Sequence, residues 1–159
     1  MSRALRTVSL VALMLGALAL GACGDEATSR EEKNAYVSEV NAAQAAFANT
    51  VTTVSGEITS KSSPAQDRRT LERFETAIAD VVKQLRAIEV PQDVEAEHQQ
   101  LISAMTDFGA EISKATKALR DPDTRSIAEA QRAITTATQT VNGRIDAAIA
   151  AINSKLQST

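Results

Sequence analysis

Residues 71–88, LERFETAIADVVKQLRAI, decide the fold of this 159-residue chain. Large apolar side chains recur in this stretch in steps of three and four residues, at Leu71, Phe74, Ile78, Val81, Leu85 and Ile88. Such spacing places one apolar stripe along one face of an α-helix. A sustained period of about 3.5 residues is typical of helices that pack in a coiled coil or a left-handed bundle. The stretch therefore predicts a helix that needs neighbouring helices to cover its stripe.

The residues that flank this stretch predict where the helix begins and ends. Ser63 and Gln66 have the spacing of a capping box, and Pro64 between them suits the first helical turn. Pro91 disfavours a helical conformation at the residue before it. We therefore expect the helix to run from Pro64 to about Val90, and Pro91 itself can begin the next helix.

Three other segments repeat the pattern. The first covers residues 29–59, where Gln44 interrupts an apolar stripe made of Val37, Val40, Phe47, Val51, Val54 and Ile58. Another begins at Pro91 and ends near Arg120, with Val94, His98, Leu101, Met105, Phe108, Ile112, Ala115 and Leu119 on its stripe. The last follows Asp121-Pro122-Asp123 and continues to Leu156. It crosses Asn142-Gly143, although glycine in a helix interior costs roughly 1 kcal/mol relative to alanine.

The predicted helices are joined by connections of only a few residues, which make consecutive helices antiparallel neighbours. We therefore expect residues 31–159 to form one all-α domain, an up-down-up-down antiparallel four-helix bundle with coiled-coil-like packing. The alternative is a long helical hairpin that pairs with a second copy of the chain, because four narrow stripes can also be covered between chains. The oligomeric state stays open.

The composition excludes several classes of function. A net charge of -3, with three Phe, one Tyr and no Trp, offers nucleic acids neither a basic surface nor many stacking side chains. The single Cys allows no internal disulfide and no Cys-based zinc site. The single His rules out most catalytic and metal-binding constellations. We therefore expect no enzymatic activity, no cofactor and no metal.

The first 24 residues differ in composition from the rest of the chain. Arg3 and Arg6 precede an apolar run at residues 8–20, and small residues follow it. A helix needs about 20 apolar residues to cross a membrane, so this run is too short to span one. A basic start, an apolar run and small residues are the layout of a secretory signal peptide.

The apolar run ends in Leu20-Gly21-Ala22-Cys23, and here the sequence resembles the bacterial lipoproteins. Their signal has Leu three residues before the cleavage point, small residues at the next two positions, and Cys directly after it. The resemblance implies that a lipoprotein signal peptidase recognises Leu20, Gly21 and Ala22, cuts after Ala22, and leaves a diacylglyceryl group on Cys23. Residues 1–22 would then be the signal peptide and residues 23–30 a lipidated tether. The alternative is an ordinary signal peptide or signal anchor with an incidental cysteine.

The resemblance to bacterial lipoproteins extends loosely to the mature chain. The helix-proline-helix corner from Leu85 through Pro91 to Leu101 is similar to that of several uncharacterised helical lipoproteins. This second likeness implies no activity.

Two polar residues on the predicted stripes, His98 and Gln44, are candidate binding residues. Glu95 and His98 have the Glu-x-x-His spacing of ferritin-like di-iron bundles, but that site needs two such pairs and two further Glu residues. His98 and Met105 share a helix face about 10.5 Å apart, too far for one metal ion. We therefore expect His98 to bond to a neighbouring side chain or water near the end of the bundle. For Gln44 we expect a role in fixing helix register, with a polar contact in an internal ligand cavity as the alternative.

Carboxylates cluster where the third helix begins, at Asp93, Glu95 and Glu97. They are expected on an exposed first turn, where negative charge complements the helix dipole. This interpretation leaves no role for them in catalysis.

These features together predict a lipid-anchored protein on the extracytoplasmic side of a bacterial cell membrane or envelope. We expect it to be a non-enzymatic binding, scaffolding or sensing module with a possible envelope protein as its partner. A carrier of a small hydrophobic ligand or lipid in the bundle seam is the alternative, and a metal-dependent redox enzyme is the third reading. The identity of the partner and the choice between inner and outer membrane stay open.

Overall fold

The computed structural model describes residues 25–58, 62–120 and 123–158. They form α1 (Asp25–Glu57), α2 (Pro64–Ala87), the short 3₁₀ helix η1 (Gln92–Val94), α3 (Glu95–Ala118) and α4 (Thr124–Ser158). No strand occurs in these ranges. The predicted all-α class is therefore confirmed, with four α-helices that pack on one another.

The capping box at the start of α2 is confirmed in detail. The Ser63 hydroxyl accepts the backbone N–H of Gln66, and the Gln66 side chain accepts the backbone N–H of Ser63 at 2.8 Å. At its other end α2 stops at Ala87, three residues before the predicted Val90, because Ile88 is already extended with ψ 134°. α3 also begins later than predicted, since Pro91 leads into η1 and the α-helix starts at Glu95.

α1 begins at Asp25, earlier than the capping pattern suggested. It therefore includes residues 25–30, for which the sequence suggested a tether. The last helix, α4, continues without a break through Asn142-Gly143, as the periodicity predicted.

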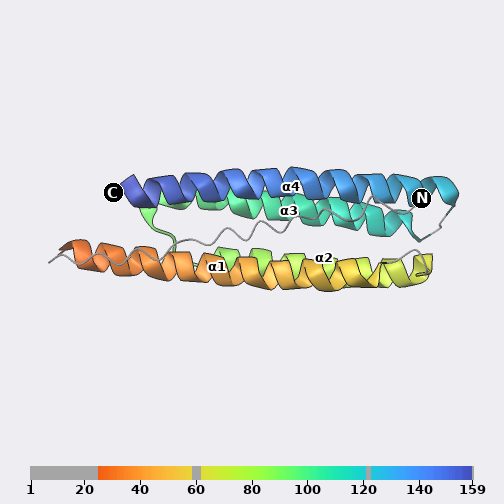
Figure 1. Ribbon diagram of the computed structural model, residues 1–159, viewed down its shortest axis with the longest axis horizontal. Coiled ribbons are helices and arrows are strands. Elements are labelled where there is room, and N and C mark those ends of the chain that lie inside the picture. Colours follow the sequence, from red (N-terminus) through yellow and green to blue (C-terminus); the bar gives the residue numbers. More distant parts are fainter. Residues whose placement is uncertain (1–24, 59–61, 121–122, 159) are drawn as a thin grey trace.

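Each helix packs against the next one along the chain. α1 lies against α2, α2 against α3, and α3 against α4, with α3 and α4 in the most extensive contact. Figure 1 shows α1 with α2 on one side of the molecule and α3 with α4 on the other. Among the described residues, α1 and α4 make almost no backbone contact. Extensive contact is therefore confined to helices that are consecutive along the chain, and the first and last helices are one of the sparsely packed pairs.

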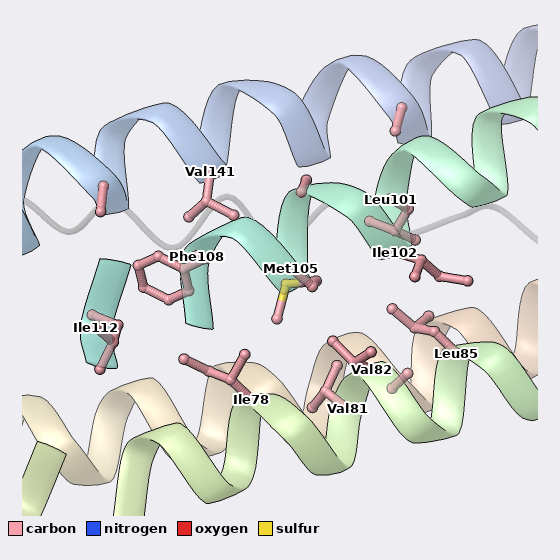
Figure 2. Packing of buried hydrophobic residues seen from close by; sticks show 14 of the residues in the cluster. Ile78, Val81, Val82, Leu85, Leu101, Ile102, Met105, Phe108, Ile112 and Val141 are labelled. Atoms are coloured by element: carbon pink, nitrogen blue, oxygen red, sulfur yellow. The ribbon is translucent and has the colours of Figure 1, made fainter. Parts of the chain in front are cut away.

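The core lies mainly between α2 and α3. Figure 2 shows Ile78 and Val81 of α2 pointing toward Met105 and Phe108 of α3, with Val141 of α4 on the other side. These side chains are buried, at 2–5% exposed. Each fully buried aliphatic or aromatic side chain stabilises the fold by about 1.5–3 kcal/mol relative to an exposed one. The stripe predicted for residues 71–88 is therefore the face that builds the core.

Three aromatic rings connect α1 to this core. Phe47 of α1 stacks on Phe74 of α2 with ring centroids 6.1 Å apart. Phe108 of α3 meets both rings edge to face, at 6.1 Å from Phe47 and 5.7 Å from Phe74. Offset and edge-to-face pairs contribute about 0.5–1.5 kcal/mol beyond the area they bury. We call Phe47, Phe74 and Phe108 the aromatic cluster.

Two glycines inside helices should respond differently to replacement by alanine. A Cβ atom at Gly143 meets nothing within 4 Å, so Gly143→Ala should stabilise the fold by about 1 kcal/mol through helix propensity alone. At Gly109 the new Cβ would lie 3.2 Å from Cγ2 of Ile78, so crowding between α3 and α2 should offset the same gain. Urea unfolding followed by circular dichroism compares the two variants. Equal stabilisation by both would contradict the close approach at Gly109.

Candidate functional site

A group of polar side chains gathers at the end of the molecule where α2 leads into η1 and α3. His98 and Glu97 come from the first turn of α3, Tyr36 from α1, and Lys155 from the last turns of α4. The backbone carbonyl of Leu85, near the end of α2, completes it. We call these residues the end cluster. It joins all four helices, which makes it the candidate functional site.

His98 is fully buried, at 1% exposed, and both of its ring nitrogens have protein partners. Nε2 lies 2.9 Å from the Leu85 carbonyl oxygen, and Nδ1 lies 3.2 Å from the Tyr36 hydroxyl. A carbonyl oxygen can only accept, so Nε2 carries a proton and donates it. In the neutral ring Nδ1 then accepts from the Tyr36 hydroxyl. The predicted bond from His98 to a neighbouring side chain is confirmed, and neither ring nitrogen is left to bind a metal in this arrangement.

Glu97 differs from the solvated carboxylate that the sequence suggested. Its side chain is only 13% exposed, and Oε1 lies 2.9 Å from Nζ of Lys155. This hydrogen bond holds the pKa of the Glu97 carboxyl below its usual range. The second oxygen, Oε2, is buried and has no partner among the described residues. The end cluster therefore contains one unused acceptor.

Within the end cluster, Tyr36 is the group that is held most strongly in its neutral form. Burial, together with the negative charge of Glu97, raises the pKa of its phenol far above the ordinary value near 10. The ring also meets the His98 imidazole edge to face, with centroids 5.6 Å apart. The folded protein therefore keeps Tyr36 as a neutral hydrogen-bond donor.

The raised pKa of Tyr36 makes the stability depend on alkaline pH. The unfolded chain releases the phenol proton near pH 10 while the folded chain retains it, so the contribution of Tyr36 is complete below about pH 10 and declines above it. Tyr36→Phe lacks this group and should cost about 1–3 kcal/mol at pH 7, because Nδ1 of His98 loses its donor. Denaturant titrations should show the difference between the two chains shrinking above pH 10 by at most about 1.4 kcal/mol per pH unit. A difference that stays constant to pH 11.5 would contradict the assignment.

A surface hollow of about 360 Å³ lies beside the end cluster. His98 forms part of its wall together with the apolar side chains of Ile88, Val90 and Ile102. Arg86 and Glu95 stand on its exposed rim. The buried imidazole therefore borders this hollow.

A second polar group lies at the opposite end of α1 and α2. The Glu57 carboxylate accepts the Thr70 hydroxyl at 3.0 Å and pairs with the Arg73 guanidinium. The bonds from Arg73 and Thr70 lower the pKa of the Glu57 carboxyl. These residues border a wide groove of about 690 Å³. Because Glu57 and Arg73 are well exposed, the pair contributes little to stability.

The other candidate residues lie apart from the end cluster. Gln44 is half-buried on the flank of α1, and Met105 lies in the apolar core. Asp93 and Glu95 are exposed, as expected. Leu20, Gly21, Ala22 and Cys23 lie outside the described residues. The sequence missed Tyr36, which sits one residue off the predicted stripe although it is the only tyrosine, and it gave no signal for Lys155.

Two kinds of functional element are absent from the described ranges. No helix within them is both long and apolar enough to cross a membrane. No three His, Cys, Asp or Glu side chains in the same ranges gather so that they could hold a metal ion. Protein-family models, curated proteins and solved structures were all compared with the chain, and none of them matches it.

Proposed function

We propose that the chain is a lipid-anchored, non-enzymatic helical bundle on the outer side of a bacterial membrane, where it acts as a binding, scaffolding or sensing module. One observation carries this proposal: the only cysteine of the chain stands directly after Leu20-Gly21-Ala22. The basic start and the apolar run before it support the same assignment. In this proposal Cys23 carries the lipid and the helices supply the module.

The finer fold belongs to the same proposal. We infer an up-down-up-down antiparallel bundle with coiled-coil-like packing. Its support is that consecutive helices pack on each other, and that residues near the start of α1, the end of α2, the start of α3 and the end of α4 meet in the end cluster. The weak contact between α1 and α4 leaves the bundle least closed along that seam.

The anchor gives this bundle an orientation. α1 begins two residues after Cys23, so the end cluster would lie near the lipid headgroups, about 20 Å or less along the helix from the anchor. The opposite end, where Glu57 pairs with Arg73, would point away from the membrane. A protein partner should therefore contact the distal end.

Fractionation of cells that express the chain tests the proposal. The protein should sediment with membranes, stay there through high-salt and alkaline washes, and dissolve in detergent, because acyl chains anchor it by apolar burial. External protease should degrade it in cells whose cytoplasmic marker proteins stay intact. Recovery of the protein in the soluble cytoplasmic fraction would contradict both parts of the proposal.

A carrier of a small hydrophobic ligand or lipid is the second candidate. The sparse contact between α1 and α4 favours it, since Val37 and Val51 of α1 and Ile145 and Leu156 of α4 are only half-buried. A ligand that separates these helices would cover such side chains. Native mass spectrometry of the gently purified protein should then detect a lipid besides the covalent anchor. A spectrum with no bound lipid would eliminate the carrier and leave the binding module.

A further inference from the structure

His98 is a buried titratable group. Neither the packing of the helices nor the proposed anchor requires a titratable side chain at this position. It is the only histidine, it is 1% exposed, and its two ring nitrogens link α2 to α1 through the Leu85 carbonyl and the Tyr36 hydroxyl. Imidazole in water gains its second proton near pH 6.5, within the range that a protein outside the cytoplasm can meet.

The Leu85 carbonyl oxygen can accept a hydrogen bond from Nε2 of His98 whether the ring is neutral or protonated. Leu85 lies in the last turn of α2, so its carbonyl has no α-helical N–H partner and receives only the three-residue bond from Ile88 at 3.2 Å. The N–H of Nε2 donates to this oxygen whether the ring is neutral or positive. Positive charge near the C-terminal end of a helix is stabilised by the helix dipole. The α2 side of the cluster therefore needs no rearrangement.

The partner of Nδ1 must change. When Nδ1 gains a proton it becomes a donor, and the Tyr36 oxygen must turn from donor to acceptor at the same contact. The phenol hydrogen then needs a new acceptor. Glu97 Oε2 is buried without a partner, and Glu97 directly precedes His98 in the first turn of α3. The bond from Lys155 keeps that carboxylate ionised in weak acid, because it lowers the pKa of Glu97.

We propose that His98, Tyr36 and Glu97 form a proton-sensing relay, in which uptake of a solvent proton at Nδ1 of His98 turns the Tyr36 hydroxyl from His98 to Oε2 of Glu97. One proton enters, the cluster gains one positive charge, and no covalent bond other than the new N–H forms. Oε2 has to move within hydrogen-bond distance of the Tyr36 oxygen. A continuous chain of hydrogen bonds then runs from the Leu85 carbonyl through the imidazole and the phenol to the ion pair of Glu97 and Lys155.

Both positive and negative side chains lie at the end of the molecule that contains His98. The titratable and charged groups at this end include Tyr36 and, one turn before it, Lys33 on α1, Arg86 on α2, Glu89 and Asp93 between α2 and α3, Glu95 and Glu97 on α3, and Lys155 on α4. Among these, Glu97 is the group with a buried oxygen that has no partner among the described residues. Glu95 is exposed on the rim of the hollow and serves as a natural control.

The relay gives the bundle a response to acid. In the neutral state α1 is bonded to α3 through the imidazole, and it hardly touches α4. In the protonated state Tyr36 would also bond to the carboxylate that holds Lys155, which ties α1 to α4 at this end. Its use as a sensor of external acidity rests on the proposed extracytoplasmic position, whereas the relay itself does not.

The composition allows a direct test, because the chain has one His, one Tyr and no Trp. Ring ¹⁵N signals therefore report His98 alone, and ultraviolet emission reports Tyr36 alone. The full chain, without a histidine tag, is studied in dodecyl maltoside between pH 8 and 4.5. A phenol that donates to a carboxylate loses emission, so Tyr36 emission should fall with the same midpoint as the His98 ring titration. Glu97→Gln should abolish the loss of emission while the ring still titrates, and Glu95→Gln should retain both responses.

Three results would overturn the relay. The first is an imidazole that gains no second proton before the chain unfolds. The second is Tyr36 emission that stays constant while His98 titrates. The third is the same loss of emission in Glu97→Gln as in the unmodified chain. Because every measurement is made in detergent solution, these outcomes do not depend on whether Cys23 is lipidated, and they are separate from failure of the proposed anchor.

Discussion

Phe108→Ala should destabilise the fold by about 3–5 kcal/mol, which is a large part of the total stability of a domain of this size. Phe108 is 4% exposed and is the only member of the aromatic cluster that meets both other rings edge to face. Removing it leaves a cavity where α1, α2 and α3 meet, and long helices cannot move inward easily to fill it. The midpoint of thermal unfolding, measured by circular dichroism at 222 nm, should fall by roughly 10 °C or more.

Phe47→Ala is the matched control for this prediction. The Phe47 ring is half-buried on α1, so its removal should cost clearly less than that of Phe108. Phe108→Leu should recover most of the loss, because it refills much of the cavity. A change below about 1 kcal/mol for Phe108→Ala would show that the three helices do not share this core.

Cys23→Ser should abolish fatty-acid labelling of the protein and release it from membranes. Serine has no thiol to which a diacylglyceryl group can be attached, and the apolar run at residues 8–20 is too short to span a bilayer by itself. Each buried CH₂ of an acyl chain contributes about 0.8 kcal/mol, so loss of two chains removes the whole anchor. Labelling with an alkyne fatty acid and detergent phase partitioning measure the two effects.

Ser9→Ala provides the control within the same leader. It removes a hydroxyl and leaves a side chain of similar size, and the sequence around Cys23 stays intact. Labelling and partitioning should therefore match those of the unmodified chain. Circular dichroism of Cys23→Ser should keep its helical signal, because α1 begins at Asp25. Unchanged partitioning of Cys23→Ser into detergent would remove the argument for localisation.

The helices and most of the core follow from local sequence signals. The steps of three and four residues in α2 and α3 predicted most of the buried faces because large apolar side chains occupy one stripe, as at Ile78 and Phe108, although Val82 and Ile102 beside the stripes are buried as well. In α1 two overlapping stripes have the same spacing, one through Val37 and Gln44 and the other through Tyr36 and Ala43. The structure buries the second, with Tyr36 1% and Ala43 2% exposed. Local spacing cannot choose between them, since the choice depends on how α1 is rotated against α2.

The end cluster was only half predictable for a related reason. His98 stood out as a polar residue on an apolar stripe, and a buried imidazole must find hydrogen-bond partners. Its partners come from residues 62 and 13 positions away along the chain, on other helices. Helix periodicity places Glu97 beside the stripe and therefore predicts a solvated carboxylate. Glu97 belongs to the end cluster only because Lys155 of α4 lies beside it.

The mass of the N-terminal peptide of the protein, isolated from membranes of a bacterial host, tests the central claim most directly. The lipid-anchored bundle predicts a peptide that begins at Cys23 and carries the added mass of a diacylglyceryl group, with or without a further acyl chain on its amino group. A peptide that retains residues before Cys23, or that contains Cys23 with a free thiol, would contradict it.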